Sequence, residues 1–79
     1  MTSPPDILAA AGRSLYGDRW LMRLARDLDI SDDTLSRWMN GRTPLNASHG
    51  VFRDAERLLR ARAIALLKAA DDISALRDS

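Results

Sequence analysis

Four polar side chains in the middle of the chain are of types that can bond nucleic-acid bases, and they would lie on the outer face of one helix. They are Asp32, Asp33, Ser36 and Arg37. Burial of Leu35 and Trp38 on one face of a helix would turn all four outward. An arginine can bond guanine through O6 and N7, and a serine can bond several bases. A carboxylate is repelled by phosphates but can accept from cytosine N4, so Asp32 and Asp33 either contact bases or only cap the helix.

Residues 20–41 contain two helical apolar patterns, and these would position the four side chains. The first helix would bury Leu21, Leu24, Ala25 and Leu28. After a break at residues 29–31, the second would bury Leu35, Trp38 and Met39 and end at Gly41. Two short helices joined by such a turn form a helix-turn-helix, whose second helix can lie in a DNA major groove.

This run resembles the helix-turn-helix of the Cro and lambda-repressor family of bacterial and phage regulators. Ala25 lies where that family keeps a small residue at the helix crossing, and Leu35 lies where it has a buried aliphatic residue. The end of the second helix resembles the family's aromatic, polar and glycine residues, here Trp38, Asn40 and Gly41. One departure is Asp29, which occupies the turn position usually held by glycine. Aspartate tolerates the left-handed conformation better than most residues, though less well than glycine.

The resemblance also implies which residues contact DNA. In the family, residues at the start of the second helix and one turn later face base edges, which singles out the four side chains named above. Residues flanking the motif resemble contacts to the phosphate backbone, and here they are Arg19, Trp20, Asn40, Arg42 and Thr43. Arg19 and the indole N–H of Trp20 lie at a positive helix start, which can meet a phosphate. The alternative for Trp20 is a hydrophobic plug between helices.

The whole chain predicts an all-α domain of four to five helices, similar to the lambda-repressor fold with a long C-terminal helix. Ser3 and the prolines after it begin the first helix, and Gly17 ends it. Its apolar residues at helical spacing are Ile7, Leu8, Ala11 and Leu15. Asp18 is expected to cap the second helix and Ser31 the third. No stretch alternates at period two over the length of a strand, so we predict no sheet.

The fourth helix is predicted from about residue 47 to between residues 70 and 73, with residues 76–79 frayed. One face would pack on the first three helices through Phe52, Ala55, Leu59, Ala63, Leu66, Ala70 and Ile73, widened by Val51, Leu58, Ala65 and Ala69. Ile64 and Leu67 lie outside this stripe, among charged residues, and predict a contact with a second copy of the chain. The alternative is two scattered surface aliphatics.

Composition limits the classes of function. The 79 residues form one domain, with the helix-turn-helix at about 19–41 and the core and dimerisation helix at about 47–73. A net charge of +1 argues against wholly non-specific nucleic-acid binding, but not against specific binding by a small dimer. Eleven of the twelve basic residues are arginine, which suits bidentate contacts, although a GC-rich genome gives the same bias. No membrane-spanning stretch or signal peptide is apparent, which predicts a cytoplasmic protein of a bacterial or phage-infected cell.

An enzymatic function is not predicted. His49 is the single histidine, near a helix start, and is expected to be a surface residue. The carboxylates are dispersed among arginines, as in solvated ion pairs, and no glycine-rich phosphate loop is present. The absence of cysteine excludes disulfides and thiolate metal sites, and nothing indicates a cofactor.

These patterns predict a DNA-binding homodimer that covers an inverted repeat and blocks a promoter, which could be its own. The small size resembles stand-alone phage or mobile-element repressors, including those encoded beside anti-CRISPR genes. No pocket for a small-molecule effector is evident, so regulation would depend on concentration. The alternative is an antitoxin or a helical adaptor whose main role is to bind a partner protein, which the acidic start of the second motif helix leaves open.

Overall fold

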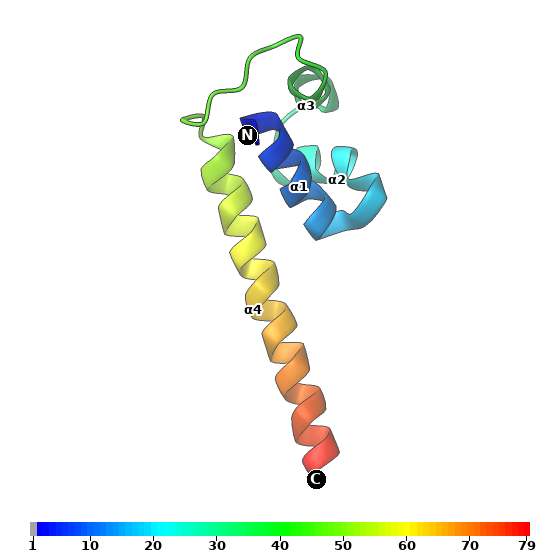
Figure 1. Cartoon of the computed structure of the whole chain (residues 1–79). Helices are drawn as coiled ribbons and strands as arrows, with labels where there is room; N and C mark the ends of the chain where they lie inside the picture. The colour runs from blue at the N-terminus through cyan, green and yellow to red at the C-terminus, as the bar shows by residue number, and fades with distance from the viewer. Residues whose placement is uncertain (1) are drawn as a thin grey trace.

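The computed structural model describes residues 2–79, which form four α-helices and one short 3-10 turn. In chain order these are α1 (Pro4–Tyr16), η1 (Gly17–Arg19), α2 (Trp20–Asp27), α3 (Asp32–Met39) and α4 (Val51–Asp78). Helices α1 to α3 cluster beside the first half of α4, and the second half of α4 extends away from them (Figure 1). Residues 2–79 contain no strand, so the all-α prediction is confirmed.

Helix α1 begins and ends where the sequence predicts. The Oγ of Ser3 accepts a hydrogen bond from the backbone N–H of Asp6 at 3.3 Å, two prolines occupy the first helical positions, and Gly17 follows the last. The buried face consists of Leu8, Ala9, Gly12 and Leu15. Ile7, which shares the predicted apolar spacing, is 51% exposed.

The start of α2 differs from the prediction that Asp18 caps it. Asp18 lies inside η1, and the residue at the N-cap of α2, Arg19, makes no side-chain cap hydrogen bond. The start of α2 is fixed instead by Trp20, whose ring is buried against Gly12 of α1. A Cβ at position 12 would lie 2.9 Å from Cδ2 of Trp20 and nearer still to Cε3, so this approach requires glycine.

The core lies where α1, α2, α3 and the beginning of α4 meet. Its largest completely buried side chains are Leu8, Leu24 and Leu35, one from each of the first three helices. Helix α1 is central, because it packs against α2, α3 and α4. The short helices α2 and α3 are therefore held on α1 as one unit.

Helix α4 begins later and ends later than predicted. The chain from residue 42 to 50 is non-helical, and α4 starts at Val51 rather than near residue 47. The Nδ1 of His49 accepts a hydrogen bond from the backbone N–H of Val51 at 3.0 Å, which satisfies a donor at the start of the helix. At the other end, residues 76–78, which were expected to fray, are helical.

The predicted core stripe of α4 is covered only as far as Leu59. Val51 and Ala55 are buried and Phe52 is half-buried, but every residue from 60 to 79 is exposed. The expectation that this stripe packs on the first three helices is therefore wrong for Ala63, Ala65, Leu66, Ala69, Ala70 and Ile73. The cause is length: α1 has 13 residues and α4 has 28, about 20 Å against about 42 Å. None of the helices in residues 2–79 is long and apolar enough to cross a membrane.

Candidate nucleic-acid interface

The turn between α2 and α3 is fixed by two backbone hydrogen bonds. The N–H of Ile30 donates to the carbonyl of Ala25 at 3.0 Å, and the N–H of Asp29 donates to that of Arg26 at 3.1 Å. This pair of bonds is a Schellman motif, which requires a left-handed residue after the helix. Asp29 has a φ of 58°, so the expectation that it takes the left-handed position of the turn is confirmed.

The packing of α2 on α3 leaves little space between them. Ala25 and Leu35 are completely buried, and Trp38 is 5% exposed. A side chain as small as that of Ala25 permits close approach of two helices. Leu21 and Met39, which were expected in this core, are only half-buried against it. The orientation of α3 is thus set by its inner face, and its outer face remains available.

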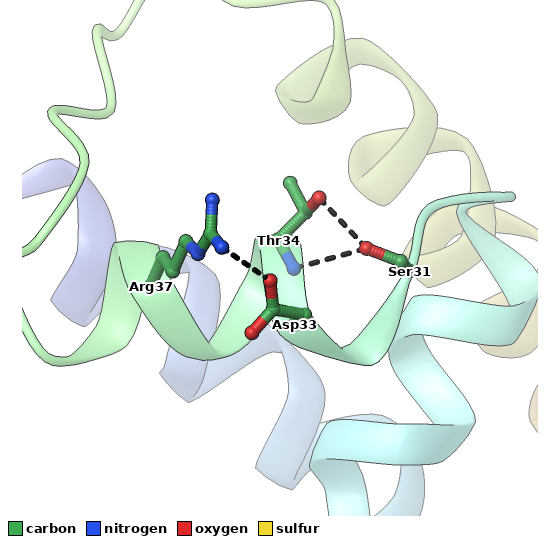
Figure 2. A network of polar contacts seen from close by, with 4 residues as sticks. All are labelled: Ser31, Asp33, Thr34 and Arg37. Atoms are coloured by element: carbon green, nitrogen blue, oxygen red, sulfur yellow. Dashed lines mark hydrogen bonds and ion pairs between the residues drawn. The ribbon is translucent and has the colours of Figure 1, made fainter.

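Ser31 caps α3, as the sequence predicts. Figure 2 shows its Oγ accepting from the backbone N–H of Thr34 at 3.0 Å and lying 2.8 Å from the Thr34 hydroxyl oxygen. The exposed Asp32 and Asp33 occupy the first turn of α3. Since Ser31 makes the cap hydrogen bond, the two carboxylates stabilise the helix through their charge at its positive end.

Arg37 and Asp33 form an ion pair along the outer face of α3 (Figure 2). The Arg37 Nη2 lies 2.9 Å from the Asp33 Oδ2, and the two side chains are 57% and 70% exposed. An exposed pair four residues apart on a helix contributes about 0.3–0.5 kcal/mol. The pair therefore orients the guanidinium without preventing its exchange to another partner. Ser36, beside them, is half-buried.

The segment after α3 is held by backbone and side-chain hydrogen bonds. The N–H of Arg42 donates to the carbonyl of Arg37 at 2.9 Å and to the Oδ1 of Asn40 at 3.2 Å, and Gly41 has a φ of 79°. This second Schellman-type ending places Asn40, Arg42 and Thr43 on the surface next to the outer face of α3. All three predicted backbone contacts in this segment are therefore exposed.

The two candidates at the start of α2 differ in exposure. Arg19 is exposed in η1, whereas Trp20 is 8% exposed and belongs to the core. The Arg13 guanidinium carbon lies 5.7 Å from the centroid of the Trp20 ring. The burial of this ring fits its alternative role as a hydrophobic plug between helices.

The charges of the outer face of α3 nearly cancel. Two carboxylates, Asp32 and Asp33, are matched by two guanidinium groups, those of Arg37 and the nearby Arg42. A face without excess positive charge attracts phosphates weakly, so it suits specific contacts better than general electrostatic binding.

Two residues that position this interface were missed by sequence reasoning. His49 is exposed, as expected of a surface residue, but its ring also meets Trp38 of α3 edge-on, with centroids 5.0 Å apart. Gly12 admits the Trp20 ring. A signal existed for Gly12, because a glycine inside a helical pattern costs about 1 kcal/mol relative to alanine and often marks close packing.

A second polar pair links α1 to α2. The Tyr16 hydroxyl donates to the Asp27 carboxylate, and burial together with this hydrogen bond raises the pKa of Tyr16 to about 12. The pair borders a groove of about 250 Å³ between these helices and α4, which Leu58, Ala61 and Arg62 also line. At neutral pH the hydroxyl is protonated and can keep its hydrogen bond.

No group of three or more histidine, aspartate or glutamate side chains within residues 2–79 could hold a metal ion. In comparisons with known proteins, the chain matches no family model, and no curated protein or solved structure is significantly similar to it.

Proposed function

We propose that this protein is a sequence-specific DNA-binding transcriptional repressor whose α2, turn and α3 form a helix-turn-helix similar to that of the Cro and lambda-repressor family. One observation carries the proposal. Helix α3 is anchored by Leu35 and Trp38 on one face, while Asp33 and Arg37 lie exposed on another. A short, rigidly held helix with an exposed polar face is what a major groove admits.

In this proposal Arg37 is the main base contact. Its guanidinium already lies along the outer face of α3, where it could bond guanine O6 and N7. A good bidentate contact contributes about 1–3 kcal/mol of discrimination. This exceeds the roughly 0.3–0.5 kcal/mol of the exposed pair with Asp33, so Arg37 can leave that pair for a base. Asp32, Asp33 and Ser36 are the remaining candidates for base contacts.

Backbone contacts would come from the residues that flank the two helices. Arg19 and Arg42 supply the exposed cations, and Asn40 and Thr43 supply neutral hydrogen-bonding groups. Trp20 would contribute by holding the start of α2 in place. Two arginine–phosphate contacts per protomer make four per dimer, which predicts a slope of about −3.6 for log K against log salt concentration.

Repression would be steric. Two copies related by a two-fold axis would bind the two halves of an inverted repeat, and a repeat that overlaps a promoter would exclude polymerase. The promoter could be that of the protein's own gene. The proposed role is one of binding and requires no cofactor.

The test is selection of bound duplexes from a random library, followed by titrations with the selected and a scrambled duplex. Arg37→Ala should lose about tenfold or more in affinity for the selected duplex and little for the scrambled one. Arg42→Ala is the matched control, and it should weaken binding to both duplexes about equally. Failure to enrich any sequence, with no salt-dependent binding, would refute the proposal.

A second function is favoured by two observations. The start of α3 carries two exposed carboxylates, and α4 exposes large apolar side chains. Both features suit an antitoxin or an adaptor that binds a partner protein. Salt dependence discriminates the two, because protein binding through an apolar helix would lack the counterion slope of DNA binding.

A further inference from the structure

The apolar stripe of α4 continues far beyond the part that α1 covers. Its members alternate at spacings of three and four residues: Phe52, Ala55, Leu59, Arg62, Leu66, Ala69, Ile73 and Leu76. This is the spacing of a coiled-coil seam, and Arg62 is its single charged member. Ala55 is buried and Phe52 and Leu59 are half-buried, so the first part of this helix face packs on the core. The later part of the same face is uncovered.

The uncovered part of this stripe exposes three large side chains to water. Leu66 is 61% exposed, Ile73 60% and Leu76 74%. Ile64 and Leu67 lie on the opposite side of the helix and are exposed to a similar degree, but they form only one pair. The stripe was expected to pack on the first three helices as far as Ile73, but its members from Leu66 onward are all exposed.

We propose that a second copy of this chain covers the stripe from Leu66 to Leu76, and that the two α4 helices run antiparallel. The inference deepens the proposed function, because it names the surface and orientation of the homodimer which that function requires. It does not need DNA for its test, so its failure and the failure of the DNA-binding proposal can be distinguished.

The position of the helical cluster selects the antiparallel orientation. Helices α1 to α3 lie along the first half of α4 (Figure 1), and the stripe residues Ala55 and Leu59 face this cluster. A parallel partner helix on the same stripe would run on into the space that α1 occupies. An antiparallel partner runs away from the cluster, and its last turn ends beside the groove lined by Tyr16, Arg62 and Ala65.

The side-chain sizes fit the antiparallel pairing. Centred near residue 71, it places Leu66 opposite Leu76 and Ala69 opposite Ile73, so each small side chain meets a large one. A parallel pairing would place Ala69 against Ala69 and leave that layer underfilled.

The charges beside the seam give a weaker and opposite preference. A parallel pair would place Asp72 near the partner's Arg77, whereas the antiparallel pair brings the two Asp72 side chains together. Each Asp72 already pairs with Lys68 of its own helix at 3.0 Å, which offsets their repulsion. Exposed ion pairs contribute little, so overlap with α1 decides the orientation.

The interface is tested by the mass of the intact protein in solution. Leu66→Asp with Ile73→Asp should give the 8.8 kDa monomer at concentrations where the wild type is a dimer. The dissociation constant should rise about a hundredfold or more, because four carboxylates enter the apolar contact. Ile64→Asp with Leu67→Asp is the matched control and should remain dimeric. The proposal would be overturned if the Ile64/Leu67 variant were monomeric while the Leu66/Ile73 variant stayed dimeric, or if the wild type were monomeric. Tryptophan fluorescence checks that each variant keeps the fold of its core.

The orientation is tested by single cysteines, since the natural chain has none. A disulfide requires Cα atoms within about 7 Å. In the antiparallel dimer the two residues at position 76 are about 15 Å apart along the axis, since each lies five residues from the centre. Leu76→Cys alone should therefore not cross-link, whereas its mixture with Leu66→Cys should. Cross-linking of Leu76→Cys alone, with no disulfide between positions 66 and 76 in the mixture, would establish a parallel dimer and refute the orientation.

Discussion

Replacement of Gly12 by alanine should loosen the contact that fixes the start of α2. The new Cβ would lie 2.9 Å from Cδ2 of Trp20, closer to Cε3, and 3.2 Å from Cδ2 of Leu24. Overpacking of this kind costs about 1–3 kcal/mol, and a buried, rigid indole favours the upper half of that range. Alanine regains about 1 kcal/mol through its helix propensity. We therefore expect a net loss of about 1–2 kcal/mol in the free energy of unfolding.

Urea denaturation followed by tryptophan fluorescence, at one fixed protein concentration, measures this loss. Gly50→Ala is the matched control: its Cβ would have no neighbour within 4 Å and its φ is −60°, so its stability should change little. Trp20→Leu should relieve the clash, so Gly12→Ala should cost less in that background. If Gly12→Ala is as stable as the wild type, Trp20 does not pack against α1 at this position.

Three further outcomes are expected. Asp29→Gly should raise the free energy of unfolding by about 0.5–1 kcal/mol. The left-handed conformation costs an L-residue about 1–2 kcal/mol, and the larger conformational entropy that glycine loses on folding offsets part of this gain. A lower melting temperature would contradict the left-handed turn at Asp29. The single tyrosine, Tyr16, should titrate near pH 12 in an absorbance titration, and Asp27→Asn should lower the pKa of Tyr16 toward 10. Because the pKa is higher in the folded than in the unfolded protein, the neutral hydroxyl contributes its full stability below pH 10. That contribution is lost as the pH rises toward 12. Asp32→Asn and Asp33→Asn should each raise the affinity for scrambled duplexes and relax the preference at one base pair. If base preference is unchanged and stability falls by about 0.3–1 kcal/mol, the two carboxylates act only by stabilising the positive end of the helix dipole.

The sequence predicts those elements whose ends depend on near neighbours. The caps at Ser3 and Ser31 and the ending at Gly41 each involve hydrogen bonds within a few residues, and all three are confirmed. The start of α4 could not be predicted in this way, because His49 is held partly by its contact with Trp38 of another helix. Asp18 failed as a cap because packing, rather than a local hydrogen bond, begins α2.

Periodicity shows which side of a helix is apolar, but it does not show what covers that side. For α3 the distinction was harmless, since Leu35 and Trp38 are both buried and Arg37 is exposed as expected. For α4 it mattered, because Leu66 and Ile73 belong to the same stripe as Ala55 but are exposed, whereas Ala55 is buried. The lengths of the helices that pack together determine where such a stripe leaves the core.

The length of α4 also sets the distance between the two DNA half-sites that the proposed dimer could bind. In the proposed antiparallel dimer, Val51 lies 20 residues from the centre in each protomer, so the two helix starts are about 60 Å apart. One turn of B-DNA separates half-site centres by about 34–36 Å, and two turns by about twice that distance. Helix α3 lies near the start of α4 (Figure 1), so the α3 helices of the two protomers would be spaced for half-sites two turns apart. Such a repressor would prefer inverted repeats with a long central spacer, and inserting half a turn of DNA there would move one half-site to the far side of the duplex.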